Sequence, residues 1–188
     1  MTYGAVLVAV VASMGAGILV GSFRPFHLSK CSMSLEGLKN VSQPQITDCG
    51  DSSADAMARG CVMEPMIYGW MPPHCRYSEV TDNYSFTKWL WYADENMTQP
   101  LTQEDLWQGK QKEIWTAQAG YHTEHCLFLW EKAGYAQKNR LPWLDRKSLS
   151  VDHVQHCIEQ LKDLGEGVNP VTMATLGIYE CDLTPWRE

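Results

Sequence analysis

Two short runs in this sequence repeat the pattern His-x-x-His-Cys. They are His122–Cys126 and His153–Cys157, they start 31 residues apart (positions 122 and 153), and they hold four of the six histidines in the chain. Imidazole nitrogen is a ligand of copper, zinc, iron and nickel. A pattern that occurs twice with the same spacing therefore indicates a metal site better than one isolated match would.

The spacing also predicts how the histidines are presented. Residues at positions i and i+3 of a helix lie on one face, about 5–6 Å apart at Cβ, so each run offers two imidazoles side by side. The connection Leu127–Asp152 is long enough for a second helix to return antiparallel to the first. We therefore expect four imidazoles to converge on one metal site: His122, His125, His153 and His156.

The cysteines decide between two kinds of site. In a reducing cell, two sets of two histidines and one cysteine could hold zinc. In an oxidising compartment, Cys126 and Cys157 would form a disulfide that joins the two helices, which leaves an all-histidine site more typical of copper or of a catalytic metal. A purely structural metal, or helices packed through neutral histidines without metal, are the alternatives to a catalytic ion.

The other five cysteines are Cys31, Cys49, Cys61, Cys75 and Cys181. Five is an odd number, so one cysteine stays unpaired within the chain, and Cys31 is the candidate. The remaining four allow three connectivities, and the sequence does not choose among them.

Several neighbours of the repeated pattern could take part in chemistry. Asp152 could orient the imidazole of His153, or it could act only as an acid in the first turn of a helix. Glu124 could serve as an acid or base, although a solvated helix face is the favoured interpretation. Tyr68, Trp70 and Trp130 are candidates for the walls of a substrate cleft.

The N-terminus and the sequons indicate the compartment. Tyr3 to Phe23 contains no charged residue and as a helix would measure roughly 31 Å, the thickness of a bilayer core. We divide the chain into a transmembrane anchor, or a cleaved signal, at 1–24, a stalk at 25–47 and a globular domain at 48–188. The first basic residues follow the anchor, which by the positive-inside rule favours a cytosolic domain. The seven cysteines and the sequons at Asn40, Asn83 and Asn96 favour instead a luminal or extracellular domain, secreted if the signal is cleaved.

The expected fold class is mainly α: a membrane-anchored luminal helical domain with disulfide-linked loops and a short strand pair. Helices are expected at Ser53–Arg59, after the capping residue Thr102, at Glu113–Ala136, and at Val151–Leu164 with Ser150 as its cap. Tyr68–Pro73 is expected to be an ordered loop, and Ser85–Tyr92 to be a strand or a pair of sheet edges.

Charge and missing motifs exclude other functions. The net charge is −7 and there is no basic run, so a nucleic-acid partner is not expected. The sequence also lacks H-E-x-x-H, G-x-S-x-G, a Walker loop and G-x-G-x-x-G.

The paired His-x-x-His-Cys runs about 30 residues apart, together with an N-terminal apolar segment and a luminal domain, resemble the UstYa-like family of fungal oxidases. The resemblance covers about Asp48 to Cys181 and is most specific at His122–Cys126 and Asp152–Cys157. It implies copper as the metal and a role in secondary metabolism, by oxidative cyclisation, hydroxylation, desaturation or halogenation. The near absence of a cytosolic segment before the anchor departs from that pattern.

Two hypotheses follow for the function. The first is a copper-dependent oxidase, with zinc or iron as the alternative metal, that acts on a peptide or small-molecule substrate. The second is a non-catalytic luminal scaffold, stabilised by metal or disulfides, that partners another oxidase. Either could be membrane-bound and could form a homo- or hetero-oligomer.

Overall fold

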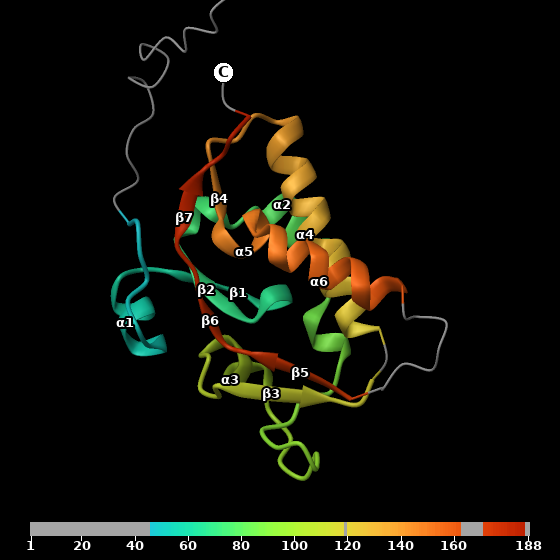
Figure 1. Cartoon of the computed structure of the whole chain (residues 1–188). Coiled ribbons are helices and arrows are strands. Elements are labelled where there is room, and N and C mark those ends of the chain that lie inside the picture. The colour runs from blue at the N-terminus through green and yellow to red at the C-terminus, as the bar shows by residue number, and fades with distance from the viewer. Residues whose placement is uncertain (1–45, 119, 163–170, 187–188) are drawn as a thin grey trace, which may run out of the picture. The chain divides into compact units, whose positions relative to one another are not determined.

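The computed structural model describes residues 46–118, 120–162 and 171–186. This part of the chain mixes helices and strands, so the expectation of a mainly α fold was wrong about the strands (Figure 1). The helices are α1 (Ser53–Ala58), α2 (Ser78–Thr81), α3 (Gln103–Trp107), α4 (Tyr121–Lys138), α5 (Arg146–Leu149) and α6 (Val151–Lys162), with 3-10 turns at Pro65–Ile67, Pro73–Cys75 and Phe86–Lys88. The strands are β1 (Val62–Glu64), β2 (Gly69–Met71), β3 (Glu113–Thr116), β4 (Trp143–Asp145), β5 (Thr172–Thr175), β6 (Gly177–Ile178) and β7 (Cys181–Leu183).

The C-terminal segment connects three small sheets. Its strands β5, β6 and β7 pair in turn with β3, β2 and β4, and β2 also pairs with β1. The pairing of β6 with β2 is parallel, while the other pairs are antiparallel. In Figure 1 this segment, in red, passes from the β3–β5 ribbon to the β4–β7 ribbon. One short stretch of chain therefore holds together elements that are far apart in the sequence.

Several helix ends confirm the sequence signals. Ser52 caps α1, and Gly60, which follows the helix, has a φ of +78°. Thr102 and Asp105 form a reciprocal capping box at α3. Ser150 Oγ accepts the backbone N–H of His153 at the start of α6. These signals are local, and so they could be found without knowledge of the fold.

Other expected elements were wrong. The helix expected at Glu113–Ala136 is two elements, because Gly120 has a φ of +99° and begins α4, while Glu113–Thr116 alternates in burial as strand β3. Tyr68–Pro73 contains strand β2 rather than only a loop. Ser85–Tyr92 contains a 3-10 turn, and of these residues Tyr92 alone is assigned an isolated bridge.

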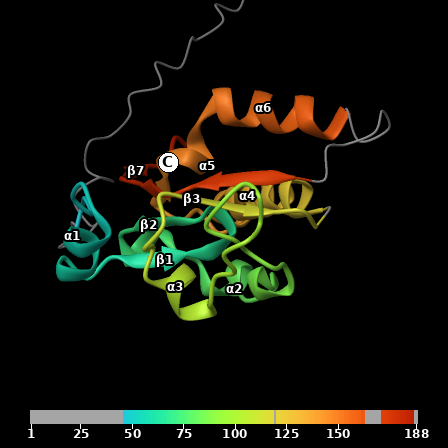
Figure 2. The ribbon, with the colours of Figure 1, turned by 90° about the horizontal axis from the view of Figure 1, so that it is seen from below.

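Helix α4 supplies much of the core. Phe128 and Leu129 are buried on it, and the ring of Tyr121 at its start contacts those of Phe86, Trp89 and Trp91. In the view of Figure 2, α6 lies on the far side of the strands from α2 and α3. The buried tryptophans, Trp70, Trp89 and Trp91, are packing residues of the core.

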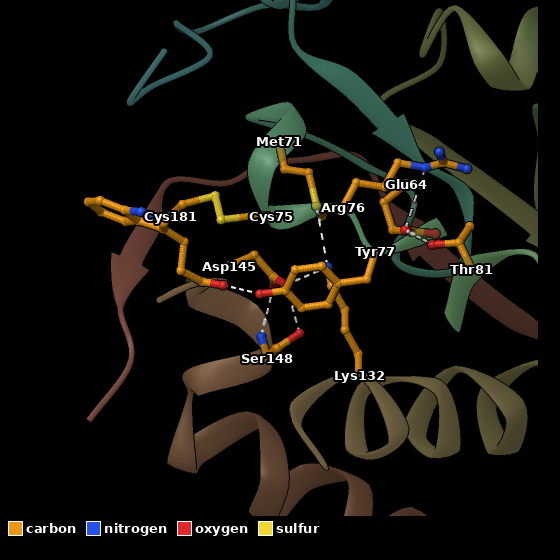
Figure 3. Close-up of polar contacts among 11 residues, drawn as sticks. Glu64, Met71, Cys75, Arg76, Tyr77, Thr81, Lys132, Asp145, Ser148 and Cys181 are labelled. Atoms are coloured by element: carbon orange, nitrogen blue, oxygen red, sulfur yellow. Dashed lines mark hydrogen bonds and ion pairs between the residues drawn. A yellow bond between two sulfur atoms is a disulfide. The ribbon is translucent and has the colours of Figure 1, made fainter. Parts of the chain in front are cut away.

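A fully buried ion pair ties α4 to the β4–α5 junction (Figure 3). Lys132 Nζ lies 2.7 Å from Asp145 Oδ2 and 3.3 Å from Met71 Sδ. Asp145 also accepts the backbone N–H and the hydroxyl of Ser148, at 2.9 and 2.7 Å, and so caps α5. Both charged side chains have no exposed surface.

The described part of the chain contains three disulfides: Cys49–Cys61, Cys75–Cys181 and Cys126–Cys157. They settle the connectivity that the sequence left open and include the bridge expected between the two repeated runs. Cys31, Asn40 and the segment Tyr3–Phe23 lie outside the described residues. Among the residues that are described, none of the helices is both long enough and apolar enough to span a membrane.

Candidate metal centre

Helices α4 and α6 bring the two His-x-x-His-Cys runs together. The Cys126–Cys157 disulfide joins the helices, with Cα atoms 5.5 Å apart. His122 faces His156 and His125 faces His153, so the histidines pair in an antiparallel sense. The repeat spacing thus places all four rings in one cluster, which we call the histidine quartet.

The quartet is arranged as two pairs, each with one histidine from each helix. The Nε2 atoms are 3.0 Å apart in the His122–His156 pair and 3.4 Å apart in the His125–His153 pair. Ring centroids are 6.0 Å apart between His122 and His125, and 5.7 Å apart between His153 and His156. Each helix therefore contributes one ring to each pair.

The two Nε2 atoms within each pair lie closer together than the nitrogens of different pairs do. Within the described residues, no three histidines of the quartet have ligand atoms that all lie within 4.8 Å of one another. The group that meets this distance consists of His74, Cys75 and Cys181. Cys75 and Cys181 form a disulfide, so that group has no thiolate to offer. The quartet offers four imidazole nitrogens instead and so remains the candidate site.

The outer nitrogen of His125 is held by the backbone. His125 Nδ1 lies 2.6 Å from the carbonyl oxygen of Met66, so Nδ1 carries the proton and donates it. This leaves the lone pair of Nε2 directed toward His153. Metal-binding histidines commonly use their second ring nitrogen in this way.

Burial favours the neutral form of three of the four rings. It lowers the pKa of His125 well below its ordinary value, and it lowers that of His153 to about 4, with Lys147 as the next cause in both. The pKa of His122 is also lowered, by burial and then by His156. Neutral imidazole is the form that binds a metal. These three rings are therefore in the form that a metal requires at neutral pH.

A cavity of about 510 Å³ adjoins the quartet. Strands β5 and β6 form its far wall, and the lining residues are Ile67, Tyr121, His122, His125, Lys147, His153, His156, Thr172, Met173, Ala174, Thr175, Leu176, Gly177 and Tyr179. Lys147 and Tyr179 were not singled out from the sequence, because no local motif marks either. Lys147 reaches the cavity because α5 packs against α4 and α6, and Tyr179 reaches it because it directly follows β6.

Three expected cleft residues do not line this cavity. The hydroxyl of Tyr68 donates to Gln111 O and the indole N–H of Trp70 donates to Ser53 Oγ, both within the core. Trp130 is half-buried on α4. The expected walls were therefore wrong, and Tyr121 and Tyr179 are the aromatic ones.

Neither acid beside the repeated runs touches the quartet. Asp152 is exposed in the first turn of α6, and among the described residues it has no hydrogen bond to His153. His153 Nδ1 instead lies 3.7 Å from Cys157 Sγ, so the orienting role expected of Asp152 is not seen. Glu124 forms an ion pair with Lys88, as a solvated helix face would.

Comparisons with known proteins give a partial match. No family model and no solved structure matches the chain. Two curated proteins of Diaporthe leptostromiformis, the Phomopsin biosynthesis cluster proteins B and B', are each 30% identical to it in an alignment of 118 positions. The match covers 58% of this chain and 34% of the relative. The chain thus spans about a third of the length of these relatives, and over that part it is similar to biosynthesis-cluster proteins.

Proposed function

We propose that this protein is a copper-dependent oxidase that acts in the biosynthesis of a fungal secondary metabolite. The observation that carries the proposal is the pairing of four histidines across two helices, with Nε2 separations of 3.0 and 3.4 Å beside a cavity. The names of the two similar proteins support the biosynthetic role.

The pair distances fit a transition metal. If both nitrogens of a pair lie about 2.0 Å from one ion, the separations of 3.0 and 3.4 Å correspond to N–metal–N angles of roughly 97° and 116°. Such angles belong to neighbouring ligands in square-planar and tetrahedral sites, the geometries of copper and zinc. Copper is the metal we propose, with zinc and iron as alternatives.

The chain's own residues supply a fixed and partly open site. The Cys126–Cys157 disulfide keeps α4 and α6 together, and the Met66 carbonyl fixes the ring of His125. The cavity gives a substrate access to the quartet. Bound there, copper would supply one-electron oxidation with dioxygen as the oxidant.

The setting we propose is the lumen of the secretory pathway, or the cell exterior, with the chain attached through its N-terminal apolar segment. Asn83 and Asn96 are exposed, as a glycan requires. The substrate would be a peptide or a small molecule. The reaction would be a cyclisation, hydroxylation, desaturation or halogenation.

A non-catalytic scaffold is the second candidate, and one observation favours it. Two neutral imidazoles 3.0 Å apart can also share a hydrogen bond, and the disulfide already joins the helices without a metal. In this case the quartet would be a packing contact and the partner would be another oxidase.

Elemental analysis of the purified full chain separates the two candidates. We expect at least one copper ion per chain, and dioxygen consumption when a substrate is supplied. A stoichiometry of one means that the four histidines share an ion, and a stoichiometry of two means that each pair holds one. Metal-free protein that stays folded, binds no added copper and consumes no oxygen would support the scaffold.

Single substitutions test the pairing. Because each pair draws on both helices, His125→Ala and His156→Ala should reduce bound copper and oxygen consumption to a similar, large extent. Within the pair His122 and His156, the double variant should lose far less than the sum of the singles, since residues that act as a unit are not additive. His74→Ala, outside the quartet, is the control, with folding checked by circular dichroism. Full activity in one single variant and none in the other would refute the shared site.

A further inference from the structure

Lys147 is a cation directed to the same cavity as the histidine quartet. It lies on α5, the short helix between β4 and α6, and its side chain lines the cavity and is half-buried. Burial lowers its pKa to about 8, which leaves it largely charged at neutral pH. An ammonium in such a place is costly unless an anion accompanies it.

The nearest acid on the same segment is already occupied. Asp145 Oδ2 accepts from Lys132 Nζ and from Ser148 Oγ, and Oδ1 accepts from the backbone N–H of Ser148. Its ion pair is with Lys132, and its charge acts on Lys147 only without direct contact, raising the pKa of Lys147 less than burial lowers it. Among the described residues the side chain of Lys147 has no hydrogen bond or ion pair, and its ammonium lies 5.6 Å from the centroid of the Tyr179 ring.

The backbone holds Tyr179 in place beside Lys147. Its ring occupies the space next to two glycines, where a Cβ on Gly69 would come within 2.3 Å of the ring and a Cβ on Gly177 within 2.1 Å. Its backbone N–H donates to Trp70 O at 2.8 Å. Tyr179 is therefore held by its surroundings, and it lines the same cavity as Lys147 and the histidines.

We propose that Lys147 binds a carboxylate of the substrate, so that this cavity takes organic acids. The inference rests on the proposed function, because it takes the cavity as the substrate site. A single ammonium suits a monoanion, whereas a phosphate dianion usually requires several donors. The apolar lining formed by Ile67, Ala174 and Leu176 suits the rest of a peptide-like acid. With its carboxylate on Lys147, such a substrate extends toward the quartet.

Binding to metal-free full-length protein tests this assignment independently of copper. The probes are N-acetylphenylalanine and its amide, which differ in the carboxylate, titrated at pH 7.5 and followed by ligand-observed NMR. We expect the acid to bind about tenfold more tightly than the amide, the usual size of one charge-assisted contact. Inorganic phosphate should not displace the acid at equal concentration.

Matched variants identify the group responsible. Lys147→Met should remove the preference for the acid, Lys147→Arg should keep it, and Lys110→Met, which changes an exposed lysine, should leave it unchanged. Circular dichroism confirms that each variant is folded. The assignment is overturned if the acid binds no better than the amide, including no binding of either, or if the preference survives in Lys147→Met. A preference for the acid in a chain that binds no copper would refute the proposed oxidase alone.

Discussion

Replacement of Lys132 by methionine is the sharpest test of how the site is supported. Methionine has nearly the same length and keeps the packing, but it leaves the carboxylate of Asp145 without a cation in a place with no exposed surface. Removal of one partner from a buried ion pair typically costs about 3–5 kcal/mol. For a domain of this size, that lowers the melting temperature by roughly 6–20 °C.

The assay is thermal and urea unfolding with a matched control. Lys110 pairs with Asp105 at 2.9 Å, much as Lys132 pairs with Asp145 at 2.7 Å, but Lys110 is exposed. Lys110→Met should therefore cost at most about 1 kcal/mol, as surface ion pairs do. The comparison isolates burial, because the residue types and the distances nearly match.

The dependence on pH gives a second readout of the same pair. Burial alone would raise the pKa of Asp145, but Lys132 and the Ser148 hydrogen bonds outweigh it, so its pKa lies below the ordinary value. The wild-type stabilisation is thus present above about pH 4, the pKa in the unfolded chain, and is lost as pH falls through the folded pKa. In Lys132→Met only the Ser148 hydrogen bonds still oppose the effect of burial, so the pKa of Asp145 rises. The deficit in stability should therefore be largest at neutral pH and should shrink as pH falls.

A double variant identifies the source of the cost. Asp145→Asn can still accept the backbone N–H of Ser148 and removes the stranded charge, so Lys132→Met with Asp145→Asn should be more stable than Lys132→Met alone. A cost for Lys132→Met no larger than that of Lys110→Met would refute the role given to burial. A double variant less stable than Lys132→Met alone would refute the stranded charge as the source of the cost.

Three further outcomes are expected. Gly177→Ala should cost roughly 1–3 kcal/mol of stability because the added Cβ meets the Tyr179 ring. Gly134→Ala, where the added Cβ meets open space in α4, should stabilise the protein by about 0.5–1 kcal/mol. The midpoints of urea unfolding measure both changes. Treatment with an N-glycosidase should increase gel mobility, and Asn96→Gln should remove part of that shift. Since burial lowers the pKa of His153 to about 4, the urea midpoint should fall as pH drops from about 6.5 toward 4, because the unfolded chain takes up the proton first; a flat profile argues against a buried ring.

The sequence by itself determined the features that depend on neighbouring residues. The His-x-x-His-Cys spacing placed two imidazoles on one helix face, twice, and the caps at Thr102 and Ser150 marked helix starts that the structure retains. Such signals extend over about one helical turn, so the chain around each one is enough to interpret it. The histidine quartet and the Cys126–Cys157 bridge could be predicted because the pattern occurs twice and the connection is long enough for an antiparallel return.

Only the tertiary structure decided which strands pair with one another. Strands β5, β6 and β7 pair with partners that lie far away in the chain, and strands of two to four residues carry almost no pattern of their own. Their pairing brings Tyr179 into the cavity, and the burial of Lys132 against Asp145 fixes the helix that carries Lys147. From the sequence alone, a lysine is expected on the surface. Only the packing shows that Lys132 forms a buried ion pair and that Lys147 lines the cavity beside the histidines.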